Sequence, residues 1–432
     1  MGWLDALRGF AAVVVALFHL SPAVLGMDVH RAILPVFDLG RYGVFLFFLV
    51  SGYVIPMSLE RHGSLRKFWV GRLFRIYPAY LTTIVLILGL VALDLLTVNQ
   101  GLKSETATGL LGHMTMLHEF LGMRGLIWPF WTLAYEMLFY LVVAGLFVWG
   151  LHRFSAYWAG GLALVALVVG SRLPDAFVGH RVADRRTLAV VVLVSFVAMV
   201  AAYLSGRRPL VMFAGVVGIE FLALPLVNGH ATKWTTASGS WQAILMLSLL
   251  FAGTVIYRMH HGQIDRRLGA GALGVVLVAL MVTNYLYTGR ERDLVVWSTA
   301  GLAVAATFAA GFALRHRPMP KALTWLGEVS YSVYLLHMVL LYVLQELVPA
   351  DMRGGPVGRA GFGLLFWACT LLAAWLCYRF VEKPGQALGR KVQDLLQQRL
   401  GPDTEPPVPA PRAETAVEGP TVVLPQVGAG SH

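Results

Sequence analysis

The feature that most constrains the fold is a series of apolar stretches, each long enough to cross a bilayer. A helix needs about 20 apolar residues to span the ~30 Å hydrocarbon core, and a chain that is 57% hydrophobic and 13% charged has many of them. None alternates with the period of two of a transmembrane β-strand. The sequence therefore predicts an all-α polytopic transmembrane helical bundle of about 10–12 helices. The predicted spans are 7–25, 42–59, 79–98, 131–150, 156–172, 187–205, 210–228, 241–258, 268–288, 294–314, 329–348 and 360–381.

The distribution of basic residues predicts how this bundle is oriented. Most of the 34 lysines and arginines fall in alternate loops on the side that holds the N-terminus, and the positive-inside rule puts that side in the cytoplasm. The loop 60–78 is the most basic, whereas 172–186 is an exception with arginines on the outer side. We expect a multi-pass protein of the inner (plasma) membrane with both termini cytoplasmic. The net charge of +11 therefore indicates orientation and not a nucleic-acid partner.

The composition divides the chain into three parts. Residues 1–385 hold all the spans and form the predicted membrane domain. Residues 386–400 form a short basic segment on the cytoplasmic side. Residues 401–432 are rich in Pro and Gly and lack apolar periodicity, so we interpret them as a disordered tail.

The first apolar stretch contains two costly polar residues, Arg8 and His19, within LDALRGFAAVVVALFH. Eleven residues are close to three helical turns, so both side chains project from nearly the same face, about 16 Å apart along the axis. An ionisable residue that deep in a membrane helix indicates a functional site. Arg8 is then suited to hold an anion at the membrane surface, with His19 acting deeper. The alternative is an interfacial arginine and a histidine hydrogen-bonded to a neighbouring helix.

Three further charged residues suggest the same kind of site. Arg72 and Arg75, in GRLFRIYPAY, are three apart and share a face if the segment is helical. Such a guanidinium pair binds phosphate in a bidentate manner, although plain positive-inside anchoring explains it equally well. Glu136, in WTLAYEMLFY, lies several residues inside a span. A carboxylate there must be neutral, paired or next to a wet cavity.

Two other patterns do not indicate a catalytic or metal-binding role. Ser51 and Gly52 are small residues inside a span, and we interpret them as a close helix contact. His113 and His118 are five apart, which is a poor spacing for chelation from one helix face. We therefore predict no metal site there.

Four separated pieces of sequence together resemble one known family. They are LDALRGFAAVVVALFH, GVFLFFLVSGYVI with RLFRIYPAY after it, WTLAYEMLFY, and LGEVSYSVYLLH followed by an EKP ending. They are similar to acyltransferase family 3 of integral membrane proteins, over residues 4–385. The family sets an arginine, ten intervening residues and a histidine, which here are Arg8 and His19. Its basic pair matches Arg72 and Arg75, and its membrane glutamate matches Glu136.

This resemblance implies transfer of an acyl group, most often acetyl, from cytoplasmic acyl-CoA to a hydroxyl of a sugar-containing acceptor, without a metal. His19 is then the candidate base for the hydroxyl proton. Arg8, Arg72 and Arg75 would bind the phosphates of the acyl-CoA donor. Glu136 would fix the tautomer of His19 or stabilise its charged form. Besides membrane lipids, the implied partner is a polysaccharide unit, which can be lipid-linked, or a glycosylated natural product such as a macrolide.

Some positions depart from the family pattern. Phe45 stands where members often have an acidic residue, and Met137 and Leu138 stand where a second glutamate and a glutamine are common. These changes leave the subfamily, and so the acceptor, open. The alternative function is a secondary transporter for a small anionic or sugar-like solute, because several spans with a few buried charges also describe one. The roles of Glu220 and His337 stay open in either case.

Overall fold

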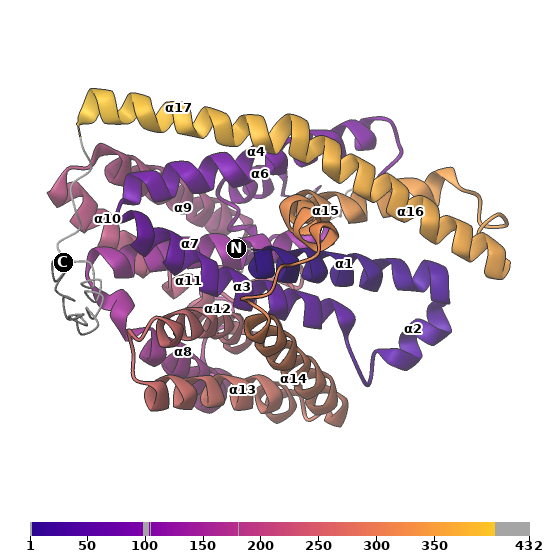
Figure 1. Cartoon of the computed structure of the whole chain (residues 1–432), viewed down its shortest axis with the longest axis horizontal. Helices are drawn as coiled ribbons and strands as arrows, with labels where there is room; N and C mark the ends of the chain where they lie inside the picture. The colour runs from indigo at the N-terminus through magenta and orange to yellow at the C-terminus, as the bar shows by residue number, and fades with distance from the viewer. Residues whose placement is uncertain (1, 98–102, 104, 180, 402–432) are drawn as a thin grey trace, which may run out of the picture.

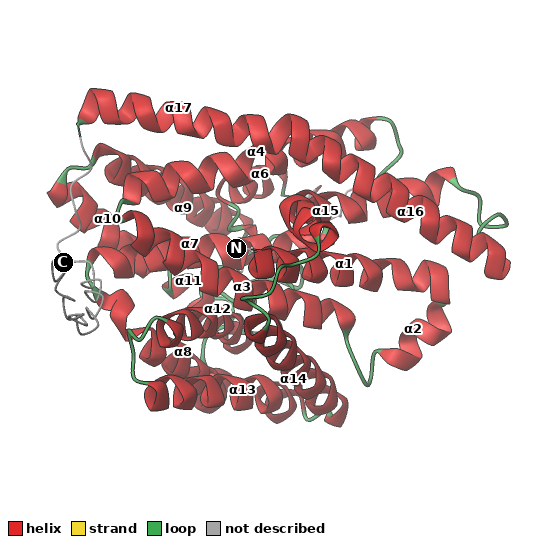
Figure 2. Cartoon of the chain, in the orientation of Figure 1, coloured by secondary structure: helices red, strands yellow, loops and turns green. Residues whose placement is uncertain are grey.

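The computed structural model describes residues 2–97, 103, 105–179 and 181–401, and this part of the chain contains helices and no strand (Figures 1 and 2). Twelve of its helical segments are long and apolar enough to cross a membrane, which confirms the predicted fold class. Eight are single helices, namely α1 (Gly2–Leu25), α3 (Leu39–His62), α4 (Leu65–Ala92), α9 (Val182–Ser205), α12 (Ser240–His260), α13 (Arg266–Thr288), α14 (Glu291–Ala313) and α15 (Lys321–Leu347).

The other four spans combine shorter helical segments. They are η2 (Trp128–Phe130) with α7 (Trp131–Val148); η3 (Leu151–Phe154) with α8 (Ser155–Leu164), η4 (Val165–Val169) and η5 (Gly170–Arg172); α10 (Arg208–Glu220) with α11 (Ala223–Val227); and α16 (Gly355–Cys377) with η6 (Tyr378–Glu382) and α17 (Lys383–Leu400). The break between α10 and α11 follows from Pro225, which the helix accepts only in the first turn of α11.

The segment 60–78, expected to be a basic loop, is instead mostly helical. Gly63 adopts a left-handed conformation with φ of 60° and ends α3, and the Ser64 hydroxyl accepts the Lys67 N–H at 3.0 Å to cap α4. The connection is therefore only two residues long, and Arg72 and Arg75 both lie within α4. The condition under which they share a helix face is met.

The core of the bundle lies around α7 and α12. In the most apolar part of each of these two spans 89% of the residues are buried, against 28% for α4. Figure 1 shows α1, α3 and α7 in the middle of the molecule. Two contacts between a glycine and the backbone of a neighbouring helix set the spacing there. A Cβ on Gly52 would lie 1.8 Å from the Leu250 carbonyl oxygen, and one on Gly327 would lie 2.2 Å from the Asp5 carbonyl oxygen. The predicted close packing at Gly52 is confirmed, and α15 lies equally close to α1.

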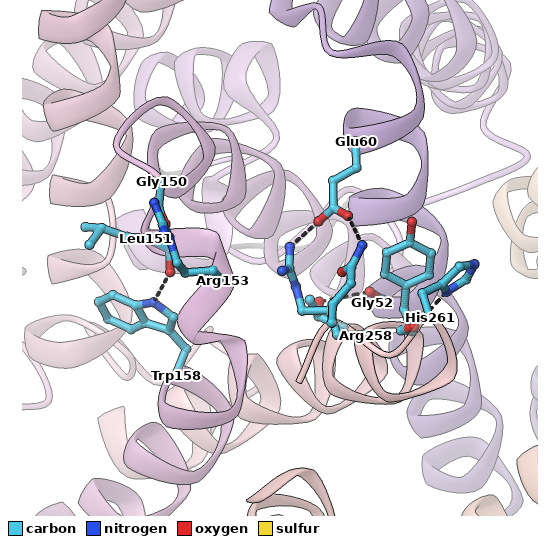
Figure 3. Close-up of polar contacts among 11 residues, drawn as sticks. Gly52, Glu60, Gly150, Leu151, Arg153, Trp158, Arg258 and His261 are labelled. Atoms are coloured by element: carbon cyan, nitrogen blue, oxygen red, sulfur yellow. Dashed lines mark hydrogen bonds and ion pairs between the residues drawn. The ribbon is translucent and has the colours of Figure 1, made fainter. Parts of the chain in front are cut away.

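The contact between α3 and α12 is reinforced by polar groups. The Thr254 hydroxyl donates to the Gly52 carbonyl oxygen at 2.9 Å, and Arg258 forms an ion pair with Glu60 (Figure 3). Gln263 donates to the second carboxylate oxygen of Glu60 at 3.1 Å. The charge of Arg258 is therefore paired with Glu60 across the contact between α3 and α12, and Arg258 is not a free cation.

A cap closes the bundle at the end where α1 finishes. It is built from α6 (Thr106–Thr115), η1 (His118–Leu121) and the connections that precede α9 and α12, while α2 (Met27–Ile33) lies beside the end of α1. Hydrogen bonds from side chains to backbone carbonyl groups hold these segments together. The Asn228 side chain donates to the Phe120 carbonyl oxygen, and the Thr232 hydroxyl donates to that of Gly122, both at 2.6 Å. The absence of a predicted span between 99 and 130 agrees with these short helices.

The last helix continues far beyond the span predicted at 360–381. From Gly355 to Leu400 the chain is helical throughout, about 69 Å at the usual rise per residue. This is more than twice the hydrocarbon thickness, and Figure 1 shows α16 and α17 as one long rod that passes alongside α4. Gly385 and Gly389 lie against Phe74 and Pro78 of α4. The basic segment 386–400 is thus a helix packed on the arginine-bearing helix, whereas 402–432 lie outside the described residues.

Candidate active site

Two cavities lie along α1, one at each of its polar residues. His19 lines a cavity of about 440 Å³ and Arg8 lines a smaller one of about 40 Å³. Val44 of α3 and Tyr334 of α15 line both cavities, so the two are neighbours separated by these side chains. The structure therefore places the two residues of the Arg8–His19 pattern in adjacent but distinct environments.

Eight aromatic side chains line the larger cavity. They come from six helical segments, and the aromatic lining consists of Phe18, Phe45, Trp128, Trp131, Tyr135, Trp297, Tyr334 and Tyr342. His19 is partly exposed to this space, and its ring lies 5.3 Å from the ring of His337, centroid to centroid. Thr236 and Ala237 of the cap complete the wall. Such a lining, apolar with few polar groups, is typical of a pocket for an organic ligand.

The polar groups of the larger cavity gather at the start of α3. Asp38 caps this helix by accepting the Arg41 N–H at 2.9 Å, and its second oxygen lies 3.9 Å from the Arg41 guanidinium. The guanidinium in turn stacks on the Trp297 ring at 4.3 Å. Gln242, from α12, also lines the cavity. These side chains offer both donors and acceptors to a bound hydroxyl compound.

The smaller cavity holds a carboxylate among arginines. Glu136 accepts hydrogen bonds from the Tyr140 hydroxyl and, at 3.3 Å, from the Ser51 hydroxyl. The charges that act on Arg8 are those of Arg75, Glu136, Tyr140 and Arg72. Four predicted site residues, Arg8, Arg72, Arg75 and Glu136, are therefore brought together at one end of α1, although they come from three helices.

Arg72 is held inside the protein and not at its surface. Its side chain is 8% exposed, and its guanidinium lies 5.4 Å from the Tyr140 ring and 5.6 Å from the Phe68 ring. A purely topological anchor needs no such burial, because a positive-inside arginine gains most by extending its charge into water. This placement favours binding over anchoring for Arg72.

The structure places Glu136 and His19 at different cavities, so this geometry gives no support to the role predicted for Glu136 toward His19. Thr132 and Glu136 line the smaller cavity, whereas Trp131 and Tyr135 line the larger one. Successive residues of a helix project about 100° apart, so neighbouring faces of α7 serve different cavities. Among the described residues, the ring in contact with His19 from another span is that of His337.

Sequence reasoning missed two residues of the arginine cluster. Tyr140 follows Glu136 by four positions, so helical spacing alone could have identified it. Glu382, in η6, is 3% exposed, accepts a hydrogen bond from the Ser332 hydroxyl and lies within electrostatic range of Arg75 and Arg8. Its position after the last predicted span gave no sign of burial.

The cap contains a buried carboxyl that supports the larger cavity. Glu119 accepts the backbone N–H groups of Thr236 and Ala237, the two cap residues of the cavity wall. Burial raises the pKa of Glu119 from 4.5 to about 7, although those N–H groups and the charge of Arg124 oppose the change. Glu119 therefore fixes the position of the wall.

His113 and His118 lie beside this carboxyl as stacked rings, 4.5 Å apart. Burial lowers the pKa of His113 to about 4 and that of His118 further below its usual value, so both are neutral near pH 7. His113 bonds to the Tyr80 hydroxyl at 2.6 Å. No group of three or more metal-ligating side chains occurs in the described part of the chain.

Comparison with known proteins finds similarity to acyltransferases. Residues 1–180 and 186–379 match the model of acyltransferase family 3, described as an acyltransferase domain. The acyltransferase MdmB of Streptomyces mycarofaciens is 33% identical over 146 residues, which cover 32% of this chain and 37% of that protein. A putative peptidoglycan O-acetyltransferase, YrhL, of Bacillus subtilis is 23% identical over 89% of this chain and 55% of its own length.

A third relative has a similar coverage. The peptidoglycan O-acetyltransferase OatA of Listeria monocytogenes is 22% identical over 88% of this chain and 55% of its own length. The chain thus spans about half the length, or less, of these curated relatives. No solved structure matches the chain.

Proposed function

Because the chain belongs to acyltransferase family 3 and is therefore an acyl-transferring enzyme, we propose that it moves an acyl group, most simply acetyl, from cytoplasmic acyl-CoA to a hydroxyl of a sugar-containing acceptor. The observation that carries this proposal is the pair of adjacent cavities along α1. One is lined by Arg8 and Glu136, with Arg72 and Arg75 close enough to act on Arg8, and the other is lined by His19 and by aromatic side chains. These are the two environments that an anionic donor and a neutral acceptor require.

The arginine end suits the donor. Coenzyme A carries a pyrophosphate and a ribose phosphate, which guanidinium groups bind through charge-assisted hydrogen bonds. Glu136 and Glu382 supply negative charge within the cluster, so the arginines stay in place without a ligand. The cavity itself is only about 40 Å³. The nucleotide therefore stays outside it, and only the narrow pantetheine arm passes along it toward the larger cavity, where the acyl thioester meets His19.

The histidine end suits the acceptor. A sugar ring has apolar C–H faces and a belt of hydroxyls, and the aromatic wall with Asp38, Arg41 and Gln242 offers partners for both. A volume of about 440 Å³ admits one or two sugar rings. The names of two relatives refer to peptidoglycan, which is one acceptor of this class.

The chemistry requires one base. Neutral His19 takes the proton of an acceptor hydroxyl while the hydroxyl oxygen attacks the carbonyl carbon of the thioester. The carbon–sulfur bond then breaks, and the leaving thiolate takes the proton back from the His19 imidazolium. The products are the O-acylated acceptor and free coenzyme A. Every atom and charge balances without a further reactant.

The helix geometry connects the two ends. With Arg8 near the donor phosphates, the pantetheine arm, on the order of 15 Å long, reaches along α1 over a helical rise of about 16 Å to His19. On the orientation inferred from the basic residues, the donor binds from the cytoplasm and the acceptor from the opposite side. The acyl group then crosses the membrane although coenzyme A does not.

The test is transfer from radiolabelled acetyl-CoA by the purified, full-length protein to a panel of sugar-containing acceptors, with free thiol measured in parallel. His19→Ala should lower the transfer rate by roughly 10² to 10⁴-fold and leave binding of coenzyme A unchanged. His30→Ala is the matched control. The His30 ring, on α2, lies near Phe18 and contacts Ser21 of α1, but it does not line the cavity. A His19→Ala protein that acylates at the wild-type rate refutes the proposal.

A further inference from the structure

His337 has two ring nitrogens in very different situations. The Nδ1 atom lies 3.1 Å from the Val333 carbonyl oxygen and 2.9 Å from that of Tyr334. Carbonyl oxygens only accept, so Nδ1 carries the hydrogen and donates it. In a neutral imidazole the other nitrogen, Nε2, then has a lone pair and can only accept. This Nε2 atom is buried and has no hydrogen-bond partner among the residues that the structure describes.

An unpaired acceptor in the core has a cost. Leaving a buried polar atom unsatisfied disfavours folding, so such atoms usually mark a function or a missing partner. His337 is fully buried at 0% exposure and cannot turn to water. The unpaired Nε2 therefore destabilises the free protein as long as no hydrogen-bond donor approaches it.

The nearest ring with a donor to offer is that of His19. The two rings lie 5.3 Å apart, centroid to centroid, and are inclined by 39°. His19 has no hydrogen-bond partner of its own among the described residues, and its ring borders the aromatic cavity. The close approach of Gly327 to α1 fixes the two helices, so the rings cannot separate without opening that contact.

In the described part of the chain no carboxylate acts on His19, and Asp38, which lines the same cavity, is engaged with Arg41. The titratable groups that act on His19 are His337 from α15 and His30 from α2. Besides its backbone contacts, His337 lies beside the ring of Tyr334, whose hydroxyl is bonded to Thr132 at 2.6 Å. Glu136 is engaged with Tyr140 and Ser51 in the smaller cavity. The third group of a catalytic triad, which is usually a carboxylate, is therefore missing beside His19.

We propose that His337 is the positioning residue for His19: its Nε2 accepts the N–H of His19, so that the other His19 nitrogen presents its lone pair to the acceptor hydroxyl. This inference rests on the proposed function, in which His19 is the base. This hydrogen bond is not made in the free enzyme and forms when substrates fill the site, because catalytic hydrogen bonds are commonly long or poorly aligned until then. His337 itself takes no proton at any step.

A neutral partner has a consequence for the reaction. A carboxylate would stabilise the His19 imidazolium strongly through its charge, whereas an imidazole lone pair stabilises it through a hydrogen bond alone. The proton taken from the acceptor hydroxyl is therefore passed on readily to the leaving thiolate. The carboxylate that lines this cavity, Asp38, is paired with Arg41, which is compatible with a His19 that has no counter-charge of its own.

The experiment compares three substitutions of His337 in the full-length enzyme. Glutamine places an amide near the position of Nε2, asparagine places one near Nδ1, and phenylalanine keeps the ring without an acceptor. We expect His337→Phe and His337→Asn to lower kcat by roughly 10- to 100-fold, as loss of an orienting partner does, with KM for acetyl-CoA unchanged. His337→Gln should keep activity within about fivefold of the wild type, because the amide oxygen replaces the acceptor.

The matched control is His261→Phe. His261 also bonds through Nδ1 to a carbonyl oxygen of its own helix, that of Tyr257 at 2.8 Å, but at the far end of α12 (Figure 3). It should transfer acyl groups at the wild-type rate. Thermal unfolding of each variant in detergent separates packing from positioning, since a packing role predicts equal loss in all three variants together with a lower Tm.

The outcomes distinguish this inference from the proposed function. Equal activity of the three variants, whether all are reduced or all match the wild type, overturns the positioning role. If His19→Ala is inactive while His337→Phe is fully active, the positioning role alone fails. If His19→Ala itself keeps the wild-type rate, the proposed function fails first, and the inference with it.

Discussion

The contact at Gly52 predicts that one added methyl group disables the enzyme. In Gly52→Ala the new Cβ would lie 1.8 Å from the Leu250 carbonyl oxygen and 3.2 Å from the Gly253 Cα. Both are backbone atoms, so no rotamer change relieves the overlap. Restoring ordinary contact requires α3 and α12 to separate by roughly 1.5 Å, because the tightly packed interior offers no space.

The displacement reaches the site through the neighbouring residue. Ser51 donates to Glu136 at 3.3 Å, already near the long limit of a hydrogen bond, so a shift of this size breaks the contact. Overpacking of this kind costs about 1–3 kcal/mol in stability. A misplacement of about 1 Å at a catalytic site lowers the rate by roughly 10²-fold. We expect both effects, seen as a lower Tm in detergent and a lower kcat for acyl transfer.

Two controls make the result specific. Gly253→Ala approaches the same contact from α12, with its Cβ 2.2 Å from the Leu49 carbonyl oxygen, and should reproduce the loss. Gly89→Ala, on the exposed face of α4, meets nothing within 4 Å and should be neutral or more stable by about 0.5–1 kcal/mol. The reasoning is refuted if Gly52→Ala is as stable and as active as Gly89→Ala.

Three further predictions concern the donor, the orientation and the cap. Arg72→Ala and Arg75→Ala should raise KM for acetyl-CoA more than they lower kcat, because phosphate binding is shared by ground and transition states, and lysine should rescue only partly; unchanged KM in both alanine variants would reduce the pair to an anchor. A cysteine at exposed Arg61, in a variant without the two native cysteines, should resist impermeant reagents in intact cells, and efficient labelling would reverse the proposed orientation. The pKa of Glu119 is raised to about 7 in the folded protein, so between pH 4.5 and 7 the folded state binds more protons than the unfolded chain, and Tm should fall as pH rises through this window. Glu119→Gln keeps the hydrogen-bond acceptor and should flatten the dependence of Tm on pH. An equal slope of Tm against pH in both proteins would contradict this prediction.

The sequence was sufficient for those features that depend on one segment at a time. Each span is recognised by its own length and hydropathy, and the Arg8–His19 spacing depends only on the helical repeat. The packing role of Gly52 follows from the absence of a side chain. Even the error at 60–78 was local, because the Ser64 cap and Gly63 end one helix and begin the next within two residues.

The features that sequence could not give depend on how helices are rotated against one another. Glu136 is one residue from Tyr135, yet the two line different cavities, and only the rotation of α7 decides which one contains the carboxylate. His337 was visible as a polar residue in a span, but its proximity to His19 results from the crossing of α1 and α15. Glu382 became part of the arginine cluster because α16 continues as a helix past its predicted end.

The placement of charge explains why one helix can join the two sides of a membrane reaction. The cluster of Arg8, Arg72, Arg75, Glu136 and Glu382 lies at the end of α1 with the small cavity and can hold the ionic groups of the donor there. Past Val44 and Tyr334 the wall is largely aromatic, and the one guanidinium that lines it, that of Arg41, is already paired with Asp38 and stacked on Trp297, so a nucleotide would lose its hydration there without meeting a free counter-charge. A neutral thioester pays no such penalty. The boundary between the cavities is therefore selective by charge as well as by size, which lets the acyl group pass while its carrier stays behind.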